Sequence, residues 1–241
     1  MNKDGRPSYL PIYARLRTLL TVTSCLVVLP VWCLGAGKPP QSWARPAAGS
    51  IPRIVQKDGR YALFVEGAPY LILGVQVNNS SAWPAMLPKV WPAVEELHAN
   101  TVEMPVYWEQ FEPEQGRFDY TVLDTLLAQA REHRVHLVLL WFGTWKNASA
   151  HYTPEWMKLS PALSVYVIDR NGRPVDSPSP YCKPALEADI RAFSTLMRHL
   201  KTTDPQHTVL MVQVENEAGT YGTVRDYSPG AQKLFEAPVP P

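Results

Sequence analysis

The sequence predicts an α/β protein of the (β/α)8 barrel type, with about the first four βα units present. Short apolar segments begin near residues 71, 101, 135 and 209, and stretches with apolar residues three and four apart follow the first three. Strands that alternate with helices predict a parallel sheet. Polar residues follow the apolar segments, as they do at the active-site mouth of such a barrel.

Residues 1–37 have the three parts of a secretory signal peptide: a basic start, an apolar stretch over residues 18–34, and small residues before a cleavage point. Pro30 and several hydroxyl side chains keep the apolar stretch below the roughly 20 residues of a comfortable membrane span. We therefore expect a periplasmic or secreted protein with no stable membrane contact once the leader is cleaved. The alternative is that an uncleaved leader anchors the chain in a membrane.

Residues 38–52 contain four prolines and read as a linker. Residues 53–70 read as a small antiparallel ribbon, because Asp58-Gly59 and Glu66-Gly67 are dipeptides of tight hairpin turns. Residues 71–241 would then form the amino-terminal half of the barrel domain.

Within that domain we expect strands over residues 71–77, 101–106, 135–142 and 209–215. The first helix has Pro92 in its expected opening turn, where proline is tolerated, and Asp119 is the expected N-cap of the second. The apolar spacing of the third helix is carried by Leu186, Ile190, Phe193, Met197 and Leu200. The connection of about 40 residues before this helix is rich in aromatic residues, which argues against a disordered linker.

Composition excludes several classes of function. The 241 residues are 46% apolar and 10% aromatic, which is typical of a globular protein. A formal net charge of +1 offers no basic face for nucleic acid. Cys182 is the only cysteine outside the leader, so no internal disulfide is expected, and the histidines show no metal-ligand spacing. We expect neither a cofactor nor a metal.

The last predicted strand ends in the residues that best fit acid–base chemistry. It reads VLMVQVENEAGTYG over residues 209–222. A period of two places Glu215 and Glu217 on one face, with Glu215 about 6–7 Å deeper along the strand. We expect Glu215 to support a buried polar network. We expect Glu217, beside Asn216 and near Tyr221, to be partly desolvated, which raises a carboxyl pKa toward the range useful for acid catalysis.

Aromatic residues follow the predicted strands, among them Trp108 after the second and Trp145 after the third. Each ring taken alone is as well explained by packing as by stacking on a sugar. Their position beside carboxylates favours sugar chemistry, because glycoside hydrolysis needs one carboxylic acid and a second carboxylate.

Two segments, NTVEMPVYWEQFEPEQGRFDY and VQVENEAGTYG, resemble the second and fourth barrel strands of clan A glycoside hydrolases, closest to the family 35 and family 42 β-galactosidases. The resemblance covers residues from about 53 to the end. It implies a retaining, exo-acting hydrolase of terminal β-galactosides, acting without a cofactor on an oligosaccharide or glycoconjugate. It also implies that Glu217 is the acid/base and that Asn216 contacts the sugar 2-hydroxyl.

The sequence departs from that family at several positions. Pro105 stands where many members have a tyrosine, and Trp145, Lys146 and Asn147 replace a Glu-Trp segment. At the end of the first strand, Asn78 is a polar candidate. We take Trp108, Trp145, Asn147, Asn78, Asn216 and Tyr221 as candidate substrate contacts.

The second catalytic carboxylate that such a hydrolase needs is missing from the predicted strands. In this clan it is a glutamate that ends the seventh strand, and only four strands are predicted here; Glu112, before Pro113, reads as a turn residue. The 241-residue chain is therefore expected to be inactive as a fragment. Two alternatives remain open: a non-catalytic carbohydrate-binding remnant, and a truncated gene product that does not fold.

Overall fold

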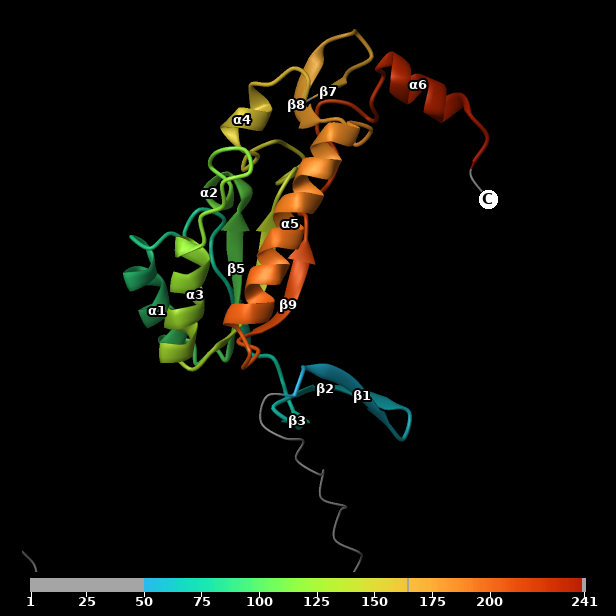
Figure 1. Ribbon diagram of the computed structural model, residues 1–241. Helices are drawn as coiled ribbons and strands as arrows, with labels where there is room; N and C mark the ends of the chain where they lie inside the picture. Colours follow the sequence, from blue (N-terminus) through green and yellow to red (C-terminus); the bar gives the residue numbers. More distant parts are fainter. Residues whose placement is uncertain (1–49, 164, 240–241) are drawn as a thin grey trace, which may run out of the picture. The chain divides into compact units, whose positions relative to one another are not determined.

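The computed structural model describes residues 50–163 and 165–239 (Figure 1). The predicted signal peptide and residues 38–49 of the predicted linker lie outside this range. None of the helices within it is long and apolar enough to cross a membrane.

The described chain begins with a three-stranded antiparallel ribbon in the order β1-β2-β3. Its strands are β1 (Arg53–Lys57), β2 (Arg60–Val65) and β3 (Ala68–Pro69). Both residues of each connecting dipeptide have positive φ, 52° and 74° at Asp58-Gly59 and 48° and 80° at Glu66-Gly67. That conformation matches the right-handed twist of paired strands, so the two predicted hairpin turns are confirmed.

The central element is a four-stranded parallel sheet in the order β4-β5-β6-β9. Glu103 pairs with Gln76 on one side and Val138 on the other, and Val138 pairs with Met211, so one layer runs across all four strands. The carboxyl ends therefore meet at one edge. The strands are β4 (Gly74–Gln76), β5 (Thr101–Tyr107), β6 (His136–Phe142) and β9 (Val209–Val214).

The first strand is shorter than predicted. It begins at Gly74 rather than at residue 71, and Leu71 is 76% exposed. The backbone groups of this segment bond to the side chain of Asn100 instead of to a strand. The Asn100 side chain accepts from the amide of Leu73 and donates to the carbonyl of Leu71.

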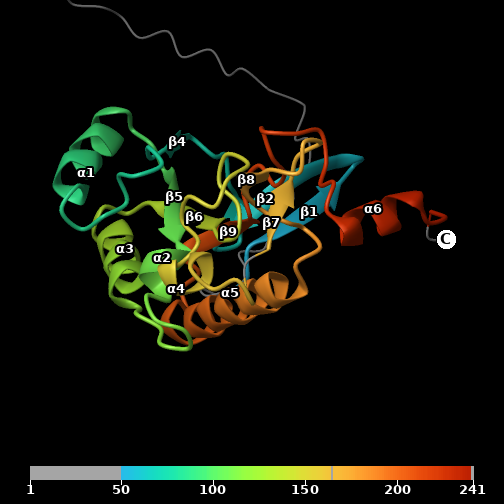
Figure 2. The same ribbon diagram turned by 90° about the horizontal axis from the view of Figure 1, so that it is seen from above.

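Three helices lie along one side of this sheet (Figure 2). They are α1 (Leu87–Glu96), α3 (Thr121–Glu132) and α5 (Lys183–Thr203). Alternate residues of β5 face them and are buried, with Val102 and Met104 at 0% exposure. The βα alternation predicted from apolar periodicity is present, because each helix can bury its stripe only against the sheet.

Two helix details differ from expectation. Pro92 lies inside α1, and another proline, Pro88, occupies the opening turn. The cap of α3 falls on Tyr120, but Asp119 still accepts a hydrogen bond from the amide of Thr121 at 2.8 Å. The carboxylate thus satisfies a free helix amide as predicted, from one position earlier.

The apolar spacing of α5 marks its buried face only in part: Leu200 is buried and Phe193 packs against the core, but the other three predicted residues do not. Leu186, Ile190 and Met197 are 54%, 53% and 39% exposed, whereas Ala188 and Ala192 are buried against the sheet. Alanines let the helix approach the strands closely, and a polar residue, Asp189, is buried between them. When a helix has two apolar faces, periodicity alone cannot predict which of them packs against the sheet.

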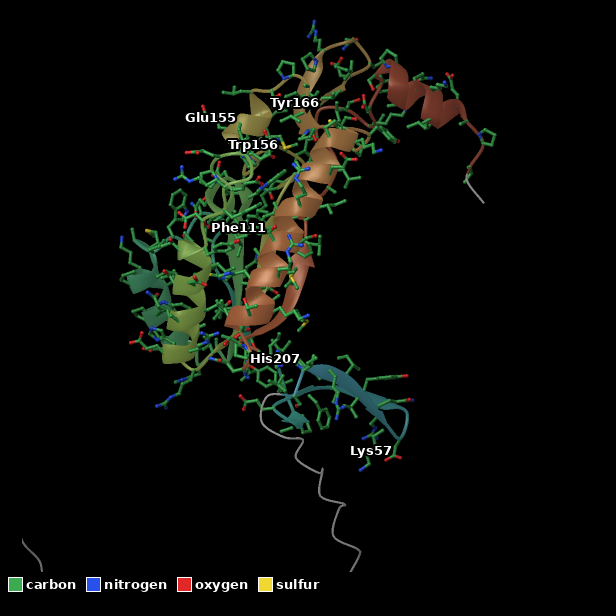
Figure 3. All side chains as sticks on the ribbon, in the orientation of Figure 1. Lys57, Phe111, Glu155, Trp156, Tyr166 and His207 are labelled. Carbon is green, nitrogen blue, oxygen red and sulfur yellow. The ribbon has the colours of Figure 1, made fainter. Side chains whose placement is uncertain are left out.

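The connection between β6 and α5 is ordered and contains α4 (Glu155–Lys158), β7 (Tyr166–Ile168) and β8 (Pro174–Pro178). Trp156 of α4, labelled in Figure 3, donates from Nε1 to the carbonyl of Glu112 at 2.9 Å, which joins the connection to the end of α2 (Trp108–Phe111). The last helix of the described part, α6 (Pro229–Glu236), follows β9.

The opposite end of the sheet is held by Asp204, which is 6% exposed. Its carboxylate accepts from the amides of Thr208 and Val209 at 2.9 and 2.8 Å and from Arg131 at 2.8 Å. Burial alone would raise the pKa of Asp204, but these hydrogen bonds hold it below its usual value. One carboxylate therefore ties the end of α5 to the start of β9 and to α3.

Replacing Asp204 by alanine is expected to destabilise the chain by about 2–3 kcal/mol, because it leaves the backbone amides of Thr208 and Val209 without their acceptor and removes the ion pair with Arg131. Since the pKa of Asp204 is lowered by folding, its contribution is present above about pH 4 and is lost as pH falls further. Urea unfolding at pH 7 and pH 3 measures both effects. Glu187→Gln, an exposed carboxylate on α5, is the control. A loss below 0.5 kcal/mol at pH 7 in Asp204→Ala would contradict the assignment.

Candidate active site

The polar residues predicted to carry the chemistry gather where the loop after β6 meets the end of β9. This loop, residues 143–153, contacts three consecutive residues. The Glu215 carboxylate accepts from the amides of Thr144 and Trp145 at 3.0 and 2.9 Å. Asn216 accepts from a lysine of the loop, and the carbonyl of Glu217 accepts from the amide of Ala148 at 3.0 Å. Each of the residues 215–217 is thus held by its own hydrogen bonds to this loop.

Glu215 forms a carboxyl pair with Asp189 of α5. Asp189 accepts from Trp141 Nε1 at 2.8 Å and from the Thr144 amide at 2.9 Å. Burial, followed by the hydrogen bond and negative charge of Asp189, raises the pKa of Glu215 to about 9. Two carboxylates this close cannot both ionise without cost, so Glu215 keeps its proton at neutral pH and is hydrogen-bonded to Asp189.

This arrangement corrects the expected direction of Glu215. The strand ends at Val214, and Glu215 has a φ of 64°, in the left-handed region. The alternation of side chains therefore breaks at this residue, and its carboxylate turns to Asp189 on the α5 side instead of following Gln213. The predicted buried polar network is present, but Glu215 and Glu217 do not share a strand face.

Gly143 is required by the closeness of the two carboxylates. A Cβ at this position would lie 2.6 Å from Asp189 Oδ2 and 2.7 Å from Glu215 Oε1. Carbon and oxygen atoms do not approach so closely, so any side chain here would displace the pair. A glycine at the end of β6 lets both carboxylates reach the backbone amides beyond it.

Lys146 is a buried cation beside the Glu-Asn-Glu segment, with 6% of its surface exposed. Its Nζ donates to Asn216 Oδ1 and to Asn147 Oδ1, both at 2.6 Å, and lies 4.9 Å from the centre of the Phe142 ring. Burial lowers the pKa of Lys146, and the Glu217 carboxylate opposes that shift. The predicted residues Asn216 and Asn147 are thus brought together by a residue that was not predicted.

Glu217 is exposed, which differs from the expected partial desolvation. Its φ of 53° is again left-handed, so two of three consecutive residues are held in a conformation uncommon outside glycine. Such backbone conformations need support from their surroundings and occur preferentially at functional sites. Here the Ala148 amide and the Glu215 carboxylate supply that support, while the side chain of Glu217 stays accessible.

The structure argues against a sugar contact at Trp108. Its ring is 0% exposed, and Nε1 donates to Glu112 Oε2 at 2.7 Å. Glu112 is itself buried and accepts from the amide of Gly116 at 2.7 Å. Glu112 is therefore the turn residue that the sequence indicated, and Trp108 packs beneath it.

The three remaining predicted contacts have different environments. Trp145 is partly buried and donates from Nε1 to the carbonyl of Pro178 at 3.2 Å. Asn78 is exposed and caps its own turn by accepting from the Ser80 amide at 3.2 Å. Tyr221 is 80% exposed. The first of these belongs to the loop that holds Glu215; the other two are available at the surface.

A cavity of about 150 Å³ lies behind the carboxyl pair. Its apolar lining comes mainly from α5, with Val214 of β9, and its polar lining includes Thr144, Asp189 and Glu215. This volume is below the 300–1,000 Å³ of typical ligand pockets. The space behind the carboxyl pair is therefore smaller than a typical ligand site.

Asp189, Lys146 and Thr144 are the residues that sequence reasoning missed. Asp189 had one available signal: it is the acidic residue on the sheet-facing side of an otherwise apolar helix stripe. Lys146 was noticed only as a departure from the family pattern. Among the described residues, no group of three or more histidine, cysteine or acidic side chains could hold a metal ion.

A parallel βα sheet with polar side chains gathered beyond the carboxyl ends of its strands is the plan of an α/β enzyme. The model of glycoside hydrolase family 42, described as beta-galactosidase, matches residues 82–238, more than half of the chain. The chain belongs to this family. The resemblance found in the sequence is thereby confirmed.

Curated relatives agree with this placement. The chain is 28% identical over 219 residues to a beta-galactosidase of Xanthomonas manihotis, covering 89% of this chain and 33% of that protein. It is 31% identical over 132 residues to beta-galactosidase BgaA of a Thermus species, covering 53% and 19%. Beta-galactosidase 10 of Arabidopsis thaliana is 25% identical over 175 residues, covering 69% and 22%. The chain thus spans a third or less of these relatives.

Two solved structures share its fold. The beta-galactosidase of Rahnella sp. R3 is 18% identical with a TM-score of 0.54, and the match covers 68% of this chain and 23% of that one. The beta-galactosidase of Marinomonas ef1 is 17% identical with the same TM-score, and the match covers 68% and 24%. At such identities the likeness concerns the fold of these glycoside hydrolases and not their specificity.

The carboxyl pair predicts a pH-dependent stability. Because folding raises the pKa of Glu215 from 4.5 to about 9, its contribution is complete below about pH 4.5 and is lost as pH rises toward 9, with a slope of up to about 1.4 kcal/mol per pH unit. Glu215→Gln, which cannot ionise, should flatten the profile over this interval. Denaturant unfolding between pH 5 and pH 9 measures it.

The control for this experiment is the exposed Glu187→Gln, which should keep the wild-type slope. If Glu215→Gln and wild type have the same slope, Glu215 is ionised in the folded state and the proton assigned to it does not exist.

Proposed function

We propose that this chain contributes the acid/base side of a site that hydrolyses terminal β-galactosides with retention of configuration. Glu217 protonates the departing glycosidic oxygen and later activates water, and Asn216 orients the sugar through its 2-hydroxyl. The four βα units form the first half of a (β/α)8 barrel. Family membership together with the Glu-Asn-Glu segment at the end of β9 carries the proposal.

The accessible side chain of Glu217 supports this assignment. An acid/base must reach the glycosidic oxygen, and Glu217 is exposed while its backbone is fixed by Ala148. Glu215 is not a suitable alternative, because both its oxygens accept backbone amides and its carboxyl group is hydrogen-bonded to Asp189. The accessible carboxyl group of Glu217 and the partly buried one of Glu215 therefore have separate roles.

The second carboxylate is proposed to come from outside the described residues. A retaining pair stands about 5–5.5 Å apart across the scissile bond. Asp189 and Glu215 contact each other directly and leave no room for a sugar between them. We therefore expect the 241-residue chain alone to show no turnover, and a longer protein containing it to be active.

Turnover of methyl and dinitrophenyl β-galactosides by the 241-residue chain and by a longer reading frame tests the proposal. In the active form, Glu217→Gln should lower kcat/KM for the methyl galactoside by about 10²–10⁴. It should lower it much less for dinitrophenyl galactoside, since that leaving group departs without a proton. Glu187→Gln is the matched control.

Equal losses on both substrates would remove Glu217 from the acid role. Turnover by the 241-residue chain, abolished by Glu217→Gln, would overturn the expected inactivity. Binding of D-galactose by a folded chain whose longer form has no hydrolase activity would favour a carbohydrate-binding role instead.

A further inference from the structure

The position of Lys146 has a chemical consequence for Asn216. A side-chain amide has one oxygen that accepts and one NH2 group that donates, and a protonated lysine only donates. The ammonium of Lys146 lies 2.6 Å from Asn216 Oδ1. If the amide were turned over, NH2 would face ammonium, so only one of its two orientations is compatible with this neighbour.

Lys146 is itself held so that it can impose this orientation. Its amide donates to the carbonyl of Ser149 at 2.9 Å, and its own carbonyl lies 3.1 Å from His151 Nδ1. The ammonium rests 4.9 Å from the Phe142 ring centre, a distance at which a cation is attracted to a ring face. Asn147 Oδ1 takes a second of its hydrogens at 2.6 Å. A buried, well-anchored donor is more rigid than a lysine on the surface.

The other end of the Asn216 amide is left available. Within the described part of the chain, the structure gives the NH2 group of Asn216 no hydrogen-bond acceptor, although its oxygen is bonded to Lys146. Asn216 is only partly buried and stands between the left-handed residues Glu215 and Glu217. A partly exposed NH2 group with a fixed direction is a donor ready for a ligand oxygen.

We propose that Lys146 is a positioning residue that locks the Asn216 amide with its NH2 group directed away from the ammonium, as a hydrogen-bond donor to a hydroxyl oxygen of the bound sugar. The identity of the sugar rests on the proposed function; the locking of the amide does not. Lys146 does not touch the substrate in this account. It acts through Asn216 by excluding the orientation in which an amide oxygen would face the ligand.

The amide resonances of Asn216 test the locking directly. In the uniformly ¹⁵N-labelled 241-residue chain, the side-chain NH2 signals are identified by their loss in Asn216→Ala. Lys146→Met, which keeps the apolar stem and removes the ammonium, should shift both proton signals toward those of a solvated asparagine. The matched control is Lys158→Met, because Lys158 Nζ donates to the His151 carbonyl near the same loop and should leave them unchanged.

A folded Lys146→Met chain with wild-type Asn216 signals would overturn the proposal. If Lys146→Met does not fold, a pH titration of the wild type decides instead. The Asn216 NH2 signals should then follow the deprotonation of Lys146, whose pKa burial lowers. Signals that do not move through that deprotonation would equally overturn it.

Sugar binding separates this inference from the proposed function. D-galactose should bind Lys146→Met about tenfold more weakly than wild type, as expected for one hydrogen bond, whereas 2-deoxy-D-galactose should bind both alike. In an Asn216→Ala background, Lys146→Met should have no further effect, because residues acting as a unit are not additive. Additive losses would mean that Lys146 acts independently of Asn216 and would contradict the proposal.

If the wild-type chain does not bind D-galactose but its Asn216 signals respond to Lys146→Met, the positioning role stands and the sugar assignment fails. The two claims therefore fail by different observations.

Discussion

The site depends on one interaction: the hydrogen bonds that the backbone amides of Thr144 and Trp145 donate to the Glu215 carboxyl group. Two parallel strands, β6 and β9, end side by side, and this contact joins the two segments that leave them. It holds Glu215 in a left-handed conformation, which in turn places Asn216 beside Lys146 and Glu217 beside Ala148. Asp189 of α5 supports this contact through its hydrogen bond with Glu215 and by accepting from the Thr144 amide as well. Removing this contact would release all three residues together.

The charges of Glu215, Lys146 and Glu217 are arranged in a way that suits acid–base chemistry. The partly buried carboxyl group of Glu215 is neutralised by its proton, the buried ammonium of Lys146 lies against two amide oxygens, and the exposed carboxylate of Glu217 is left for solvent or substrate. Burying a lone charge is costly, whereas a paired or hydrogen-bonded one is tolerated. The arrangement keeps Glu217 accessible while the groups around it are rigid.

The alternation of strands and helices, the two hairpin turns and the family could be predicted from the sequence, because apolar periodicity, Asp-Gly and Glu-Gly dipeptides and the Glu-Asn-Glu segment are local signals. The direction of Glu215 could not, since period-two alternation assumes an extended backbone and a φ of 64° ends it. Neither could the burial of Trp108 against Trp141 and Trp156 or the approach of Asp189, which depend on contacts between residues far apart in the chain. Lys146 stood beside the predicted residues, but only its contact with Asn216 reveals a role.

Hydrogen exchange of the loop amides measures the central contact most directly. In the wild-type chain at neutral pH, the amide of Trp145 should exchange at least about 100-fold more slowly than an unprotected amide. Glu215→Ala should remove that protection, while the Ile168 amide, bound by Asp226 at 3.1 Å, keeps its own. A Trp145 amide that exchanges at the unprotected rate in wild type, or that stays protected in a folded Glu215→Ala chain, would contradict the account.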